Sequence, residues 1–172
     1  MSEHNHQHEH HHHEEEVSKY EKTLQQYTIE LDDAQVQQAV KTIIAEKTLA
    51  NDTPEVKKFL FGSIELTTLS TTDSDTSVMA FVDRVNQFEN SYPQLPHVAA
   101  VCVYPCFAEV ASETLEVEGV EVTCVSGSFP SSQAVIEVKV AETALAVRDG
   151  ATEIDIVMPV GKFLFGNYEE LC

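Results

Sequence analysis

Basic residues are scarce in this chain. Its 172 residues include 10 Lys and Arg against 29 Asp and Glu, which gives a formal net charge of −19 at neutral pH. Proteins that bind nucleic acid neutralise the backbone phosphates with clustered Lys and Arg, and the few here are scattered along the sequence. We therefore expect no nucleic-acid partner. The strong acidity mainly promotes solubility.

Long apolar runs are also missing. A membrane-spanning helix needs about 20 consecutive apolar residues, and no stretch of the sequence approaches that length. The beginning of the chain is hydrophilic and lacks the apolar segment of a secretory signal. The sequence therefore predicts a cytoplasmic protein with no membrane partner.

Motifs for nucleotides and for metals are absent as well. Neither GxGxxG nor the P-loop pattern occurs, so nothing indicates dinucleotide or P-loop nucleotide binding. No CxxC pair occurs among the cysteines, so we predict reduced thiols, no zinc site, no disulfide and no cofactor. Two of the cysteines stand in apolar runs suited to a core. The cysteines are Cys102 and Cys124, which stand in those runs, and Cys106 and Cys172.

Residues 1–16 form a tail rich in His and Glu, with seven histidines between His4 and His13. Such a composition cannot build a core, so the tail is predicted to be disordered. It is either a weak chelator of Ni, Zn or Cu ions or a solvated, tag-like segment, and we favour the solvated segment.

Residues 17–62 read as a helical extension. Apolar residues from Val36 to Ile44 recur at helical spacing. Asp32 or Asp33 can cap the start of that helix by accepting a free N–H group. A second helix is predicted from Pro54, which suits a first helical position, to a stop at Gly62.

From residue 63 to residue 172 the pattern alternates between strands and helices. The strands are apolar on both faces, as in parallel strands that helices cover. The pattern alone indicates an open α/β sheet or part of a (β/α)₈ barrel. The predicted strands are 63–67, 98–104, 120–126 and 153–158; the predicted helices are 78–88, 107–117, 133–149 and one that starts at residue 168.

Asp155 is a lone carboxylate in the apolar run around the last of these strands. Burial of such a group is costly unless it is paired, hydrogen-bonded or neutral. It is either a functional acid or a structural residue that bonds the backbone at a strand end. Along the strand it shares one face with Val157, while Ile154, Ile156 and Met158 share the other.

Several stretches together resemble the deoxyribose-phosphate aldolase family, the class I Schiff-base aldolases. They match in order, spacing and local sequence from about residue 56 to residue 172. The stretches are IELTTL at 64–69, VAAVCVYP at 98–105, VTCVS at 122–126, FPSSQ at 129–133, EVK at 137–139 and DGATEIDIV at 149–157. The resemblance implies the first half of a (β/α)₈ TIM barrel, strands one to four.

The resemblance also implies a reaction. 2-Deoxy-D-ribose 5-phosphate, the sugar-phosphate partner, is cleaved reversibly to D-glyceraldehyde 3-phosphate and acetaldehyde. A lysine forms a Schiff base with the sugar carbonyl, and the protonated imine takes up electrons, so no metal is needed.

The resemblance assigns roles to four residues of this sequence. Asp155 matches the family's aspartate of strand four, which acts with lysines and a water in proton transfer. Cys102 matches a pocket-wall cysteine, although a plain core thiol is nearly as good an interpretation. Thr67 matches a threonine near the substrate, and Glu65 stands where many members carry Asp. Outside this set, Ser128 stands where close relatives tend to have Gly.

The family's Schiff-base lysine lies in a Phe-Ile-Lys-Thr-Ser-Thr-Gly-like motif on strand six, which this sequence lacks. Lys139, on a predicted helix, and Lys162, in a predicted loop after strand four, are expected to be solvated. We therefore expect the chain alone to be inactive. It is either a fragment of a full enzyme or a half that pairs with a partner carrying strands five to eight.

The alternative is a non-catalytic protein, either a degraded pseudo-enzyme or an association module with a metal-binding His tail. In each case, four strands of a barrel would leave two open sheet edges and an uncovered inner face, which favours self-association.

Overall fold

The computed structural model describes residues 18–27 and 30–171. The predicted disordered tail at 1–16 lies outside the described residues. By its internal contacts the chain divides into two units, Met1–Ile43 and Ile44–Cys172, and the boundary falls within one helix.

The first unit contains helix α1, Lys19–Leu24, and the start of helix α2, Asp33–Asn51. Ser18 and Glu21 form a capping box that satisfies free N–H groups at the start of α1. Asp32 caps α2 as predicted, because its carboxylate accepts the Ala34 N–H at 2.9 Å. Neither helix contains a buried residue.

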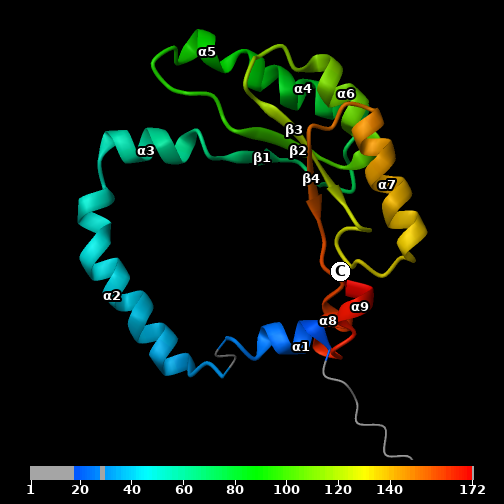
Figure 1. Cartoon of the computed structure of the whole chain (residues 1–172). Helices are drawn as coiled ribbons and strands as arrows, with labels where there is room; N and C mark the ends of the chain where they lie inside the picture. Colours follow the sequence, from blue (N-terminus) through cyan, green and yellow to red (C-terminus); the bar gives the residue numbers. More distant parts are fainter. Residues whose placement is uncertain (1–17, 28–29, 172) are drawn as a thin grey trace, which may run out of the picture. The chain divides into compact units, whose positions relative to one another are not determined.

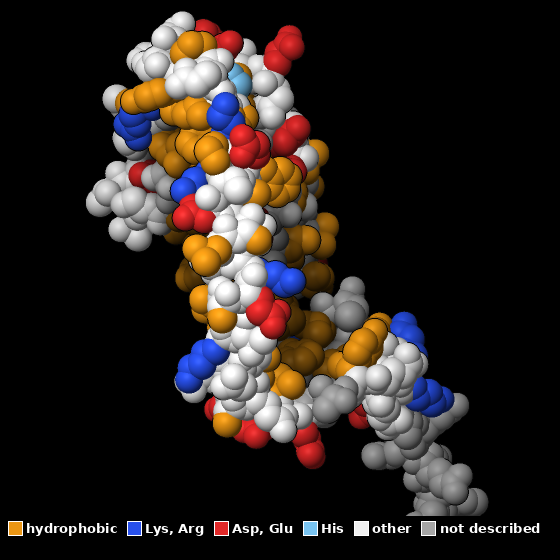
Figure 2. All heavy atoms as spheres, turned by 90° about the vertical axis from the view of Figure 1, so that its left-hand side faces the viewer, with side chains coloured by type: hydrophobic (Ala, Val, Ile, Leu, Met, Phe, Trp, Pro, Cys, Tyr) orange, Lys and Arg blue, Asp and Glu red, His pale blue; other side chains and the backbone are white. Residues whose placement is uncertain are grey.

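The second unit begins with the end of α2 and helix α3, Pro54–Phe61. Thr53 caps α3 through the Val56 N–H at 3.2 Å, and Pro54 takes the first helical position as predicted. Phe59 and Leu60 are exposed on α3. Apolar side chains are exposed among charged ones on the face seen in Figure 2.

The second unit contains a four-stranded parallel sheet whose strand order follows the sequence (Figure 1). This confirms the predicted α/β class and the parallel pairing. Each strand is shorter than its predicted range. The strands are β1 at Glu65–Thr67, β2 at Ala100–Val103, β3 at Glu121–Ser126 and β4 at Glu153–Ile156.

Helices connect the strands, as parallel pairing requires. They are α4 at Asp75–Asn86, α5 at Phe88–Ser91, the 3₁₀-helix η1 at Pro105–Phe107, α6 at Ala108–Thr114, α7 at Ile136–Arg148, α8 at Val160–Leu164 and α9 at Tyr168–Leu171. In the part of the chain that the structure describes, no helix is both long and apolar enough to cross a membrane.

Helices α4 and α6 differ from the prediction in their bounds, and α5 was not predicted. Helices α7 and α8 differ from it as well. Helix α7 begins at Ile136 rather than Gln133, because Ser132 takes a left-handed conformation with φ 55° and its N–H bonds back to Ser128. Helix α8 was not predicted; it has only five residues, and its Gly161 is a weak helix former.

The core lies between one face of the sheet and helices α4, α6 and α7 (Figure 1). Val101 and Val103 of β2 pack there with Val78 and Val82 of α4, and all four are fully buried. Full burial of one such side chain contributes about 1.5–3 kcal/mol. This apolar layer holds the two central strands in place.

Only the central strands β2 and β3 are buried over most of their length, so the prediction of four strands apolar and covered on both faces is wrong for the edges. All three residues of β1 are exposed, and three of the four in β4 are exposed. The reason is position: an edge strand has a neighbour on one side only.

Gly150 ends α7 with φ 108°, and an added Cβ would meet the Ser112 Oγ at 2.5 Å. We predict that Gly150→Ala lowers the free energy of unfolding by at least about 1–3 kcal/mol, through backbone strain and the clash. Urea denaturation measures this. Gly161→Ala is the matched control, since nothing lies within 4 Å of its Cβ position. Equal stability of the two variants would contradict the account.

Candidate active site

The face of the sheet opposite the core carries a row of polar side chains. Thr67, Cys102, Thr123 and Glu153 are paired in register across the four strands, so they share this face. The Thr123 hydroxyl donates to the Glu153 carboxylate at 3.0 Å. We call this row, together with Glu65 and Asp155, the polar face.

Asp155 lies on the polar face because strand β4 alternates. Ile154 packs against the core, and Asp155, in register with Val125, therefore points the other way. The residue is exposed, because β4 is an edge strand and its polar face is open. Within residues 18–27 and 30–171 no hydrogen bond or ion pair involves its carboxylate.

Cys102 is 1% exposed at the centre of the polar face. Burial is the largest cause that raises the pKa of its thiol to about 12, and a hydrogen bond with the Glu65 side chain and the charges of Glu65 and Asp155 contribute to the same rise. The thiol is therefore neutral at physiological pH, and a neutral thiol is a poor nucleophile. This fits the pocket-wall interpretation of Cys102. The effect of Glu65 and Asp155 on this pKa also shows that both side chains lie near the Cys102 thiol.

The other described cysteines differ from one another. Cys124 lies in the core, where burial raises the pKa of its thiol to about 11. Cys106 is exposed in η1. The prediction that Cys102 and Cys124 are buried is confirmed, and Cys172 lies outside the described residues.

Tyr104 and Phe129 follow the carboxyl ends of β2 and β3, and sequence reasoning missed them. Their rings lie 6.2 Å apart between centroids, and the Tyr104 hydroxyl donates to the Leu69 carbonyl at 3.3 Å. The loops after β1, β2 and β3 are thus joined at this end of the sheet. The signal was available, since residues directly after barrel strands are the ones that form active sites.

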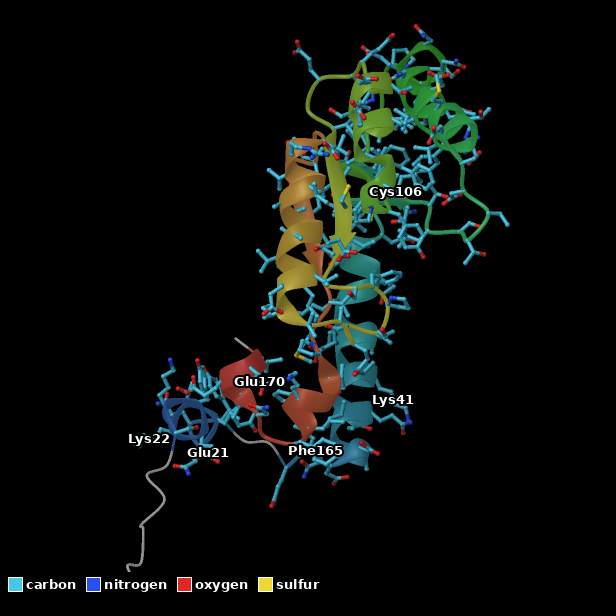
Figure 3. The ribbon with its side chains drawn as sticks, turned by 90° about the vertical axis from the view of Figure 1, so that its right-hand side faces the viewer. Glu21, Lys22, Lys41, Cys106, Phe165 and Glu170 are labelled. Atoms are coloured by element: carbon cyan, nitrogen blue, oxygen red, sulfur yellow. The ribbon has the colours of Figure 1, made fainter. Side chains whose placement is uncertain are left out.

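Lys139 is not simply solvated as predicted, and Lys162 remains partly exposed but lies in helix α8 rather than in the predicted loop. The Lys139 ammonium donates to the Ser132 hydroxyl at 2.7 Å, and Lys162 forms an ion pair with Glu170. Both are half-buried and line one cleft of about 900 Å³ between the start of α7 and helices α8 and α9. Figure 3 labels Phe165 and Glu170, which line the same cleft. Neither lysine forms an ion pair with Asp155.

The loop between β3 and α7 explains Ser128. Its φ is 63°, a left-handed conformation that favours glycine, and its N–H donates to the Glu142 carboxylate at 2.8 Å. The departure from glycine is thus accommodated with one backbone bond to α7.

The chemistry on the polar face is therefore that of acids. Two carboxylates, those of Glu65 and Asp155, flank a neutral thiol, and a positioned carboxylate can transfer protons. In the described part of the chain this face carries no amine that could form a Schiff base, and no group of side chains there is arranged to hold a metal ion.

Comparison with known proteins shows which family the chain resembles. No protein-family model matches the chain. A Caenorhabditis elegans protein provisionally named deoxyribose-phosphate aldolase is 36% identical over 134 residues, which are 75% of this chain and 43% of the relative. The chain thus spans less than half the length of this curated relative.

Solved structures agree with the fold. The aldolase QR15 matches 69% of this chain and 47% of its own at 31% identity, with a TM-score of 0.55. A Coccidioides immitis protein, also provisionally named deoxyribose-phosphate aldolase, matches 82% of this chain and 54% of its own at 23% identity, with a TM-score of 0.58. The predicted half-barrel is confirmed: four parallel strands align with about half of an aldolase barrel.

Burial protects two of the described thiols, so we predict that iodoacetamide at pH 8 modifies Cys106 at least about tenfold faster than Cys102 or Cys124 in the folded chain. Peptide mass mapping measures the rates. Since burial is the first cause of the raised pKa of Cys102, Glu65→Gln leaves Cys102 protected, and Glu121→Gln serves as a matched control. Rapid labelling of Cys102 in the unsubstituted chain would contradict this description.

Proposed function

Because this chain belongs to the deoxyribose-phosphate aldolase family as a partial-length relative, we propose that it supplies the acid–base half of a class I aldolase site. The reaction is the reversible cleavage of 2-deoxy-D-ribose 5-phosphate to D-glyceraldehyde 3-phosphate and acetaldehyde. The amine that forms the Schiff base comes from residues outside this chain.

One observation carries the proposal. Asp155 presents a carboxylate without an ion pair on the polar face, beside a neutral thiol and a second carboxylate. An ammonium group placed against that face would meet negative charge from Glu65 and Asp155. A lysine there would be held near both carboxylates, and a proton would travel only a short distance between the lysine and Asp155.

The roles follow from this arrangement. The lysine attacks the sugar carbonyl, water leaves, and the protonated imine accepts the electron pair of the cleaved carbon–carbon bond. Asp155, acting with a water, moves protons to and from the reacting carbons and the hydroxyl. Cys102 is a neutral wall. Tyr104 and Phe129 border the opening at the carboxyl ends of the strands, where barrel enzymes bind substrate.

We predict that the 172-residue chain alone has no aldolase activity and gives no covalent adduct when borohydride is added with the sugar phosphate. We then join this chain to the part of the Caenorhabditis elegans relative that lies beyond the match. This chimaera is expected to cleave the sugar phosphate and to give the covalent adduct. Mass spectrometry and coupled reduction of the aldehyde product measure the outcome. A stoichiometric adduct on Lys162 of the isolated chain would overturn the proposal.

In the chimaera, Asp155→Asn is predicted to slow turnover by about 10²–10⁴-fold, as loss of a positioned acid or base does. Asparagine keeps the shape and removes the titrating group. Glu121→Gln is the control, because Glu121 shares the same face at the amino end of β3, in register with Ala100. Near-normal turnover of Asp155→Asn would return Asp155 to a structural role.

A further inference from the structure

A chain of hydrogen bonds joins helix α7 to the carboxyl end of β4. The Lys139 ammonium donates to the Ser132 hydroxyl at 2.7 Å, and that hydroxyl donates to the Val157 carbonyl at 2.9 Å. Val157 lies two residues after Asp155, and its own N–H donates to the Ser126 carbonyl at 3.1 Å. The two bonds at Val157 thus fix the backbone that follows the acid.

Ser132 is well suited to this relay. It is 3% exposed, and its φ of 55° is stabilised by the bond from its N–H to the Ser128 carbonyl at 2.9 Å. This buried hydroxyl uses its proton and one of its two lone pairs, and the charge on the lysine strengthens the bond that the lysine donates. Loss of the ammonium leaves the Ser132 hydroxyl with one more unmet lone pair in a buried place.

A second anchor holds the other end of the same loop. The Glu142 carboxylate accepts from the Ser128 N–H at 2.8 Å, one turn along α7 from Lys139. Thr143 shares a hydroxyl bond of 2.6 Å with the buried Ser126 at the end of β3. Side chains on one side of α7 therefore fix both ends of the loop that carries Phe129.

The backbone of the loop after β3 also lies close to the backbone at the end of β4. A Cβ on Gly127 would come within 3.3 Å of the Val157 carbonyl oxygen, and Gly127 has φ 77°. The loop and the end of β4 are in direct contact, so a shift of one moves the other.

We propose that Lys139 is a positioning residue: through Ser132 it fixes the carboxyl end of β4, and with it the direction of the Asp155 carboxylate. The consequence for catalysis rests on the proposed function, whereas the mechanical link does not. Lys139 touches no reacting atom in this account and acts only through Ser132 and the backbone of β4.

Amide hydrogen exchange in the full 172-residue chain, followed by NMR, tests the link without any activity. Lys139→Met is expected to speed exchange at the Val157 and Ser132 amides by at least about tenfold, to shift the amide signal of Asp155, and to leave Val101 and Val103 of β2 unchanged. Lys139→Arg keeps a charged donor and is expected to restore both readouts.

Lys162→Met is the matched control, because Lys162 lines the same cleft but pairs with Glu170. It is expected to loosen α9 and to leave Ser132 protected. Ser132→Ala cuts the chain at the next link, so its effect at Val157 should match that of Lys139→Met, and the double variant should add nothing.

Either of two results for Lys139→Met alone would overturn the proposal. One is unchanged exchange at Val157; the other is equal acceleration at Val157 and in β2, which would show general destabilisation. Additive effects of Lys139→Met and Ser132→Ala would also contradict it. Failure of the chimaera to turn over substrate would bear on the proposed function alone, since the exchange rates depend on no substrate.

Discussion

The burial of one face of β2 and β3 is the constraint on which the rest of the structure depends. Val101, Val103, Val122 and Cys124 pack against α4, α6 and α7, and because side chains alternate along a strand, Cys102 and Thr123 must then point the opposite way. Because the edge strands β1 and β4 pair in register with β2 and β3, their side chains divide between the same two faces. The position of Asp155 on the polar face is therefore fixed by packing that Asp155 does not share.

Much of the fold could be predicted because it depends on local signals. The strand–helix alternation gave the parallel sheet, Pro54 and Asp32 gave helix starts, and Gly150 gave a helix end. Burial of the edges could not be predicted in this way. The apolar residues of β4 predict a covered strand. Exposure, however, depends on how many strands lie beside it, and the periodicity of the sequence carries no information on that number.

The site was predictable in part for the same reason. Alternation along β4 sufficed to place Asp155 opposite the core, and the apolar run around Cys102 sufficed to bury its thiol. The hydrogen bond of Lys139 could not be predicted. Its partner Ser132 lies in a loop with a left-handed conformation, and the residue types of that loop do not indicate this conformation. A lysine on a helix reads as solvated unless that loop geometry is known.

The polar face carries negative charge from Glu65 and Asp155. After burial, the next causes that raise the pKa of the Cys102 thiol are Glu65 and Asp155. No amine shares their face in the described residues, which is why we propose that another segment supplies the amine. Peptide mapping of the borohydride-reduced adduct in the chimaera tests this most directly. We expect the modified lysine to lie in the part of the chimaera that follows Cys172, and an adduct on Lys139 or Lys162 would contradict this.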